Sequence, residues 1–191
     1  LFKTIVTNDK IDAITITLAE MADKDGFASA IMKIFADHQI NIDSIGIEGT
    51  SMTFSLPLPR DQADQEAYRD RIRKVMDALK IIHVKGESFT NADIKWDQEN
   101  LGSISVIGKE LQNRAGILGS ISTTFGCFGI NVYSVSHSKN QTRITFLIDR
   151  NKCREAARLL HSIYVDNDEA IKDEMRRRRD AKDKELTGTF S

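Results

Sequence analysis

The sequence of 191 residues lacks several features that would quickly assign it to a class of protein. Its formal net charge is −1, which argues against a dedicated nucleic-acid-binding protein because such proteins concentrate positive charge. It contains two cysteines, too few for a disulfide framework. No apolar run approaches the roughly 20 residues that span a bilayer. Because no signal peptide is recognisable, we expect a cytoplasmic protein that binds neither nucleic acid nor membranes.

Motifs typical of catalysis are also missing from the sequence. It has no glycine-rich phosphate loop, and its four histidines are scattered at spacings that do not suit zinc. Cys127 and Cys153 lie among apolar residues, so we interpret both as buried thiols. We therefore expect no catalytic residue, metal ligand or cofactor within this chain. It begins with Leu1 rather than Met, so we expect it to be a piece of a longer protein.

The sequence does contain an internal repeat. Segments of its first half recur 90 positions later, which indicates two copies of one small fold. Differences between the copies then indicate which of them binds a ligand. The matching segments are Ile14–Ile16 with Ile104–Val106, Gly26 with Gly116, and Ile40–Ser44 with Ile130–Ser134.

Hydrophobic periodicity predicts a β-α-β-β-α-β order in the first copy. Alternating residues favour strands, and apolar residues at helical spacing, such as Ile31 and Phe35, favour helices. This order is typical of an α+β, ferredoxin-like fold. The predicted strands are 13–18, 41–47, 51–56 and 81–84, and the predicted helices are 27–38 and 61–80.

The second copy repeats this order but runs short of one strand. After Val165 the chain becomes charged, and no apolar segment remains for a fourth strand. Because an unpaired sheet edge is a liability, we predict that the N-terminal run Phe2–Val6 completes the second sheet. The other predicted elements are strands at 103–107, 131–136 and 143–148, and helices at 117–128 and 151–164.

These assignments define the expected domains. The first covers residues 12–86, and the second combines 1–8 with 102–165. Residues 87–101 are expected to be a polar linker, in which 93–96 could form a short strand. The charged tail, 166–191, contains the run Arg176–Arg179 between acidic residues, which we interpret as a solvated helix of mixed charge.

The most promising functional feature is the turn before the helix at 27–38. Gly26 lets other groups approach the backbone closely, and the first N–H groups of the helix lack internal partners, so they can bind a carboxylate. Asn41 and Asp43 follow the same helix, and Asp43 offers a carboxylate to an ammonium group, facing either its own loop or a neighbouring unit. Together these groups describe an amino-acid site. The alternative is that Gly26 only makes a turn and Asp43 is a surface acid.

The second copy differs from the first at this site. It keeps Gly116 and Asn131 but has Tyr133 where the first copy has Asp43. The acid that would bind an amine is therefore missing. We expect the first copy to bind the ligand and the second copy to be a structural partner.

At these residues the sequence resembles the paired ACT domains of the aspartate kinase family. Asp23–Gly26, followed by a helix and then by Ile40–Asp43, is similar to the first ACT domain. The resemblance covers residues 1–165 and implies that the N-terminal strand completes the second ACT domain. The segments similar to that second domain are Ser105–Gly108, Gly116, Gly129–Val132 and Ala156–His161.

The resemblance implies a regulatory region that binds an end product of the aspartate pathway and mediates feedback inhibition. The family's kinase domain uses ATP and Mg to phosphorylate aspartate to 4-phospho-L-aspartate, and it would precede Leu1. A homodimer through the ACT domains is the expected assembly. Carried over position by position, the effector-binding residues would be Met21, Lys24, Gly26, Phe27, Ala28, Asn41, Ile42, Asp43 and Glu48.

The resemblance favours lysine as the effector and leaves threonine open. The segment Met21–Phe27 is closer to the lysine-sensitive branch, and Asp23 and Glu48 could bind the second ammonium group of lysine. Two positions depart from the family pattern. Asp25 stands where a proline is common, and Ile47 stands where many threonine-binding members carry glutamine.

Three other functions fit the sequence less well than a regulatory region does. A stand-alone ACT-domain regulatory subunit of another enzyme, such as acetolactate synthase, would not explain an N-terminal strand that continues from something upstream. An RNA-binding module would need exposed aromatic residues on its central strands, and the sequence offers few there. An acylphosphatase would need a phosphate-binding loop with a fitting arginine, and Arg114 is isolated.

Overall fold

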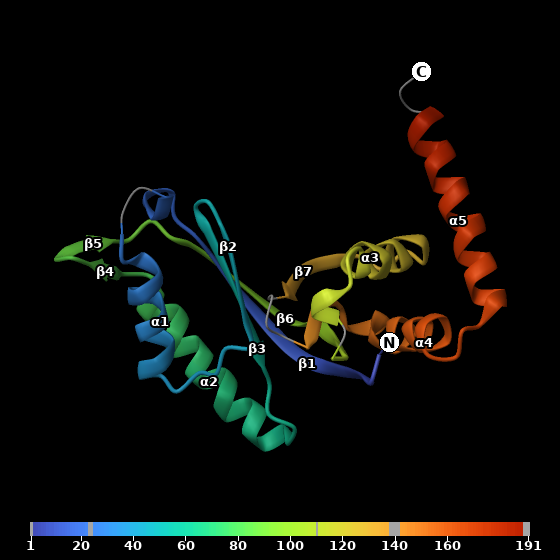
Figure 1. Cartoon of the computed structure of the whole chain (residues 1–191). Coiled ribbons are helices and arrows are strands. Elements are labelled where there is room, and N and C mark those ends of the chain that lie inside the picture. The colour runs from blue at the N-terminus through green and yellow to red at the C-terminus, as the bar shows by residue number, and fades with distance from the viewer. Residues whose placement is uncertain (1, 23–24, 110, 138–141, 189–191) are drawn as a thin grey trace. The chain divides into compact units, whose positions relative to one another are not determined.

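The computed structural model of the chain describes residues 2–22, 25–109, 111–137 and 142–188 (Figure 1). It divides into two compact units, which we call the first unit (Lys10–Leu101) and the second unit (Leu1–Asp9 with Gly102–Ser191). The strands are β1 (Thr4–Thr17), β2 (Ser44–Glu48), β3 (Ser51–Pro57), β4 (Ile82–Val84), β5 (Glu87–Phe89), β6 (Asp93–Ile107), β7 (Val132–His137) and β8 (Arg143–Asp149). The α-helices are α1 (Phe27–Asp37), α2 (Gln62–Leu79), α3 (Ile117–Cys127), α4 (Cys153–Tyr164) and α5 (Glu169–Gly188), and the short 3₁₀ turns are Ala19–Ala22, Leu111–Asn113 and Arg150–Lys152.

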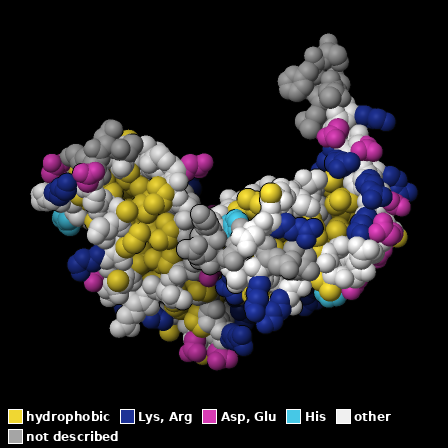
Figure 2. Space-filling model, in the orientation of Figure 1, with side chains coloured by type: hydrophobic (Ala, Val, Ile, Leu, Met, Phe, Trp, Pro, Cys, Tyr) yellow, Lys and Arg dark blue, Asp and Glu magenta, His cyan; other side chains and the backbone are white. Residues whose placement is uncertain are grey.

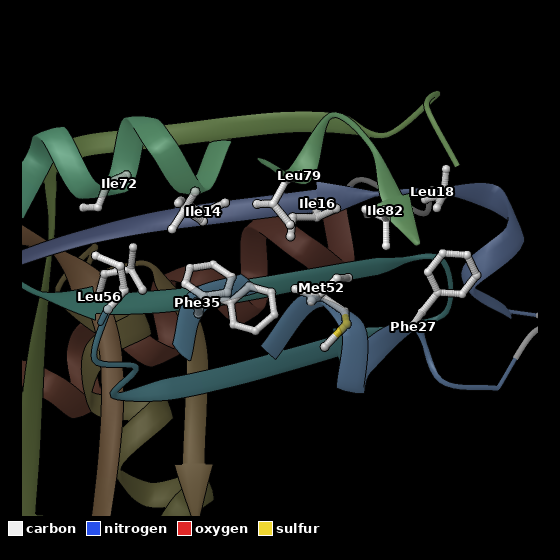
Figure 3. Close-up of a cluster of buried hydrophobic side chains, with 14 of the residues drawn as sticks. Ile14, Ile16, Leu18, Phe27, Phe35, Met52, Leu56, Ile72, Leu79 and Ile82 are labelled. Atoms are coloured by element: carbon white, nitrogen blue, oxygen red, sulfur yellow. The ribbon is translucent and has the colours of Figure 1, made fainter. Parts of the chain in front are cut away.

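In the first unit the strands lie in the order β2-β3-β1-β6, and both β1 and β2 are antiparallel to β3. Helices α1 and α2 contribute apolar residues to the core that covers this sheet, as Figure 3 shows. Phe35 of α1, for example, lies 4.6 Å from Phe54 of β3, measured between ring centroids. This is the predicted ferredoxin-like arrangement, and the α+β fold class is confirmed.

In the second unit the order is β1-β6-β8-β7, so the N-terminal part of β1 takes the fourth position. The N–H of Lys3 donates to the carbonyl oxygen of Ile107 at 2.7 Å. Phe2 and Ile5 pack against the core that α3 and α4 form with this sheet. The prediction that the N-terminal strand completes the second sheet is therefore confirmed.

One predicted strand of the first unit has a different role. The run expected as the fourth strand, 81–84, forms β4, which pairs with β5 in a separate two-stranded sheet. The fourth position of the main sheet belongs to β6 instead. The physical reason is that Lys85 and Gly86, with φ of 50° and 87°, turn the chain back after three strand residues.

The expected linker at 87–101 is also corrected by the structure. It forms β5 and the first part of β6, with a short connection between them. Ile94 and Trp96 alternate with polar residues, and both pack against the core of the first unit. A strand with one apolar face has a polar composition overall, which is why the segment resembled a linker.

A buried polar cluster joins three elements of the first unit. Asp12 of β1 is fully buried, and the indole Nε1 of Trp96 in β6 donates to its Oδ2 at 3.1 Å. The Nε of Arg69 in α2 lies 3.9 Å from the same oxygen. Because a buried carboxylate needs partners, this cluster fixes α2 and β6 to β1.

The charged tail forms the helix α5, as predicted, but it is not solvated on all sides. Ile171 packs against the core of the second unit. The hydroxyl of Thr124 donates to the sulfur of Met175 at 3.4 Å, and the guanidinium of Arg178 lies 4.7 Å from the ring centroid of Phe128. One side of α5 therefore rests on α3, while charges of both signs cover its outside (Figure 2).

Candidate functional site

Helix α1 begins after a glycine, so its N-cap residue offers no side-chain hydrogen bond to the first backbone N–H groups. Its N-cap residue Gly26 is left-handed, with φ of 104°, a conformation that glycine adopts without strain. The first α-helical hydrogen bond runs from Ala30 N–H to the carbonyl of Gly26, at 3.0 Å. The N–H groups of residues 27–29 therefore lie ahead of the helical ladder, next to the exposed Asp25 and Gly26. This geometry suits the carboxylate of a small ligand.

Five of the predicted effector-binding residues lie at this end of the first unit. The N–H of Leu18 donates to the carbonyl oxygen of Thr50 at 2.9 Å. Thr17 and Glu48 lie on either side of the same residue of β3, so β1 and β2 both end at this edge of the sheet. Figure 3 shows Phe27 and Leu18 at the same end of the core, away from Leu56. The five residues are Met21, Gly26, Phe27, Ala28 and Glu48. Lys24, also predicted, lies outside the described residues.

Asn41, Ile42 and Asp43 lie at the other end of the same sheet. The N–H of Asp43 donates to the carbonyl of Ser55 at 2.9 Å, and this part of β3 is level with Ala13 at the start of the core. The hydroxyl of Tyr68 donates to the carbonyl of Asn41 at 3.2 Å. Burial raises the pKa of Tyr68, so its hydroxyl remains a donor to a higher pH than an exposed tyrosine would.

The two groups of residues are too far apart to hold one amino acid within a single copy. Helix α1 has 11 residues, which corresponds to about 16 Å between its ends. From Ser44 to Glu48, β2 advances by about 13 Å. The α-carboxylate and α-ammonium groups of an amino acid are attached to the same carbon. Asp43 therefore does not face the loop at Gly26 of its own unit.

The corresponding region of the second unit keeps the backbone geometry but has different side chains. Gly116 precedes α3 with φ of 78°, again without a side-chain cap. The hydroxyl of Tyr133 donates to Oδ1 of Asp149 at 2.8 Å, so the carboxylate of Asp149 is hydrogen-bonded within the second unit. The residue in the place of Asp43 is therefore a tyrosine whose hydroxyl is bound within the second unit.

The hairpin formed by β4 and β5 lies beside Gly26 of the first unit and was not predicted from the sequence. It packs on the start of α1 through Val84, Lys85 and Phe89. A signal was available, because two short strand-like runs flank the pair Lys85–Gly86. A two-residue connection with glycine is typical of a hairpin.

Within the part of the chain that the structure describes, no cluster of three or more His, Cys, Asp or Glu side chains could hold a metal ion. Among the same residues, no helix combines the length and the apolar character needed to cross a membrane. Cys127 and Cys153 are buried free thiols, as predicted.

Comparisons with known proteins match both units. Residues 104–164 match the ACT domain family. The aspartokinase of Corynebacterium glutamicum is 27% identical over 173 residues, which cover 87% of this chain and 37% of that protein. The chain thus spans little more than a third of the length of this curated relative.

Solved structures match the fold over most of the chain. The regulatory subunit of aspartate kinase from Thermus thermophilus, in a ligand-free form, has a TM-score of 0.65 at 16% identity, covering 84% of this chain and 96% of its own. Aspartokinase III of E. coli, solved in complex with lysine and aspartate in the T-state, has a TM-score of 0.60 at 16% identity, covering 86% of this chain and 33% of its own.

The fold and these matches indicate the class: residues 104–164 match an ACT domain, and the chain has the fold of paired ACT domains. More particularly, the chain is similar to aspartokinases in sequence and to the regulatory subunit of an aspartate kinase in fold. The resemblance to the regulatory region of aspartate kinase, expected from the sequence, is confirmed.

Proposed function

We propose that this chain is the amino-acid-sensing region of an aspartate kinase and mediates feedback inhibition by an end product of the aspartate pathway. Lysine is the favoured effector and threonine is the alternative. The phosphorylation of aspartate, with its ATP and Mg, belongs to a kinase domain outside this chain. The T-state complex of the E. coli relative with lysine and aspartate supports this proposal. The effector biases the kinase through different affinities for two states.

The observation that carries the proposal is the start of α1, whose N-cap residue is a glycine without a capping side chain, beside exposed residues of the first unit. Free N–H groups and the positive end of the helix dipole attract a carboxylate. At the other end of the unit, Asp43 supplies the acid for an amine, and Tyr133 replaces it in the second unit. The proposed site residues are the described members of the predicted set: Met21, Gly26, Phe27, Ala28, Asn41, Ile42, Asp43 and Glu48.

We propose further that two copies of the chain form a homodimer that brings Asp43 of one protomer to Gly26 of its partner. The separation of these residues within one copy requires a second copy if both are to bind the same amino acid. Strand β2 is an edge strand, and its Ile45 and Ile47 are 39% and 64% exposed on the side of Phe54 and Met52. Hydrophobic side chains are visible over this unit in Figure 2. An open edge with exposed apolar residues favours association.

A second candidate function is that of a separate regulatory subunit that acts on another polypeptide. The match to nearly the whole Thermus regulatory subunit favours it. Such a subunit would bind its effector in the same way but would act in trans. Adding the purified chain to an aspartate kinase or acetolactate synthase that lacks regulation would distinguish it, because only a separate subunit restores inhibition when supplied as a second chain.

Calorimetric titration with lysine, threonine and methionine tests the proposal. We expect heat with lysine, or otherwise with threonine, and we expect Asp43→Ala to weaken that binding at least about tenfold because a charged partner of the amine is lost. Asp37→Ala is the matched control, since it removes an exposed acid of α1 that pairs with Lys33 at the helix end. Sedimentation should show that the bound effector increases the dimer fraction.

Two results would contradict the proposal. Absence of heat from every amino acid would remove the sensing function. If a strictly monomeric chain binds the effector with normal affinity, the site is not shared between two protomers, because Gly26 and Asp43 lie too far apart within one copy.

A further inference from the structure

The β4–β5 hairpin is an addition to the ACT fold of the first unit. The sheet β2-β3-β1-β6 already contains the four strands of the β-α-β-β-α-β order. The hairpin forms its own two-stranded sheet with the register Ile82↔Phe89 and Val84↔Glu87. Its two strands are joined by the tight turn at Lys85 and Gly86. The fold itself does not require it, so its position calls for another explanation.

The hairpin contacts three consecutive residues at the start of α1. The Nζ of Lys85 lies 3.7 Å from Oδ2 of Asp25. A Cβ placed on Gly26 would lie 3.4 Å from Cγ1 of Val84, so this side chain borders the glycine at van der Waals distance. The ring of Phe89 meets that of Phe27 at 4.7 Å between centroids, in an edge-to-face arrangement.

The hairpin is anchored on one side and open on the other. Ile82, labelled in Figure 3, is fully buried and Val84 nearly so, and both belong to the core of the first unit. His83 and Ser88 point away from this core and hydrogen-bond to each other across the strands at 3.0 Å. Lys85, at the tip, is largely exposed beside Asp25. The buried side therefore fixes the hairpin against α1, and the tip places Lys85 beside Asp25, the residue before Gly26.

We infer that the β4–β5 hairpin is a wall of the effector site and that its packing on α1 is coupled to effector binding. This inference rests on the proposed amino-acid site at Gly26. A carboxylate held by the first N–H groups fixes the first turn of α1, and with it the ring of Phe27 against which Phe89 packs. Lys85 adds a positive charge on the side where the carboxylate enters. Phe89 is thus a positioning residue and Lys85 a specificity-determining residue for the carboxylate end of the ligand.

The coupling has a direct route along the chain. β5 leads through residues 90–92 into β6, the strand that continues from the first unit into the second. A ligand that favours the packed hairpin therefore favours one conformation of the segment that enters β6. Differential affinity for the packed hairpin is all that such coupling requires.

Hydrogen exchange on the whole chain tests the inference without any substitution. With saturating lysine, or with threonine if that is the ligand that binds, amides of residues 82–89 should exchange more slowly, together with those at the start of α1. Two controls apply. The same peptides are measured without ligand, and the peptides of α4 in the second unit should exchange equally fast with and without it. Unchanged exchange at 82–89, with slower exchange at 27–30, would overturn the inference while leaving the effector site in place.

Substitutions give an independent test. Phe89→Ala should weaken effector binding about fivefold in calorimetry, because an aromatic contact that holds Phe27 is lost. Phe2→Ala is the matched control, since it removes a ring that lies 4.8 Å from Tyr164 in the second unit, and it should bind normally. Lys85→Ala, at an exposed position, should fold normally and weaken binding by a factor of about two to five.

The outcomes separate the inference from the proposed function. If the unsubstituted chain binds no amino acid, both fail. If it binds lysine or threonine while Phe89→Ala and Lys85→Ala bind just as tightly, the hairpin is not part of the site and only the inference is lost. If Phe89→Ala does not fold, Lys85→Ala and the exchange measurement decide the question.

Discussion

At the scale of single residues, Gly102 shows how closely β6 is packed in the second unit. A Cβ at this position would overlap the Sγ of Cys153 and lie 3.0 Å from the carbonyl oxygen of Asn8. We expect Gly102→Ala to lower the free energy of unfolding by about 1–3 kcal/mol, as overpacking of a close contact does. Urea unfolding measures this change.

The control for this substitution lies in the same unit. Gly119 is in α3, where a Cβ would meet nothing within 4 Å. Gly119→Ala should leave stability unchanged or raise it by up to about 1 kcal/mol, because alanine favours the helix. Equal effects of the two substitutions would contradict the account of Gly102.

The buried thiol of Cys153 gives a prediction on pH. Burial raises the pKa of Cys153 from 9.0 to about 11, with Asp9 adding to the effect. The unfolded chain therefore loses this proton at a lower pH than the folded chain does. The free energy of unfolding should fall as the pH rises from about 9 to about 11, and this loss should disappear in Cys153→Ala.

Removal of the other buried thiol provides the comparison. Cys127→Ala should retain the fall in stability over the same pH range, measured by urea unfolding at a series of pH values. A parallel pH profile for the unsubstituted chain and Cys153→Ala would refute the assignment.

At the scale of elements, α5 is held on α3 by side chains along its length, including Lys182, whose Nζ donates to the carbonyl of Gly126. Arg177 and Arg178 both pair with Glu174, at 3.1 Å and 2.7 Å, but only Arg178 lies over the ring of Phe128. Arg178→Ala should therefore destabilise the second unit by about 0.5–1 kcal/mol. Arg177→Ala loses an exposed ion pair alone and should cost less than about 0.5 kcal/mol. If Arg177→Ala and Arg178→Ala lower the thermal unfolding temperature equally, the contact with the ring of Phe128 contributes nothing.

At the scale of the whole molecule, the two units share β1 and β6 but depend differently on the N-terminus. Deleting residues 1–9 removes the strand beside the second-unit part of β6, including the bond from Lys3 to Ile107. We expect the second unit to lose its protection against hydrogen exchange, because its sheet gains an open edge and its core loses Phe2 and Ile5. The first unit, which begins at Lys10, should stay folded. Equal protection of β8 with and without residues 1–9 would contradict this dependence.

Much of the fold was predictable because it follows from local patterns. The repeat at 90 positions, the helices α1 to α4 and the strands β3 and β8 are visible as periodicity, and Gly26 and Gly116 adopt the left-handed conformation expected of turn glycines. The missing fourth strand of the second copy also pointed to the N-terminal run. In each case the prediction depends either on the residues of a single element or on the absence of an element that the fold needs.

The sequence did not reveal which segment fills the fourth position of the first sheet. Ile82–Val84 is more apolar than Asp93–Trp96, yet β6 has this place. Pairing between distant strands depends on length and on what each face packs against, and neither is a local property. The buried partner of Trp96, the carboxylate of Asp12, lies 84 positions away and could not be anticipated from either segment.

For the candidate site, the sequence by itself determined the chemistry: an uncapped glycine turn before α1, an acid at Asp43 and a tyrosine in its place in the second copy. Only the tertiary structure decided the distances. The length of α1 and the direction of β2 place Gly26 and Asp43 at opposite ends of one unit, and the β4–β5 hairpin lies at the end with Gly26. Residue types set which groups can bind, but the spatial arrangement of strands and helices sets which of them can bind the same molecule.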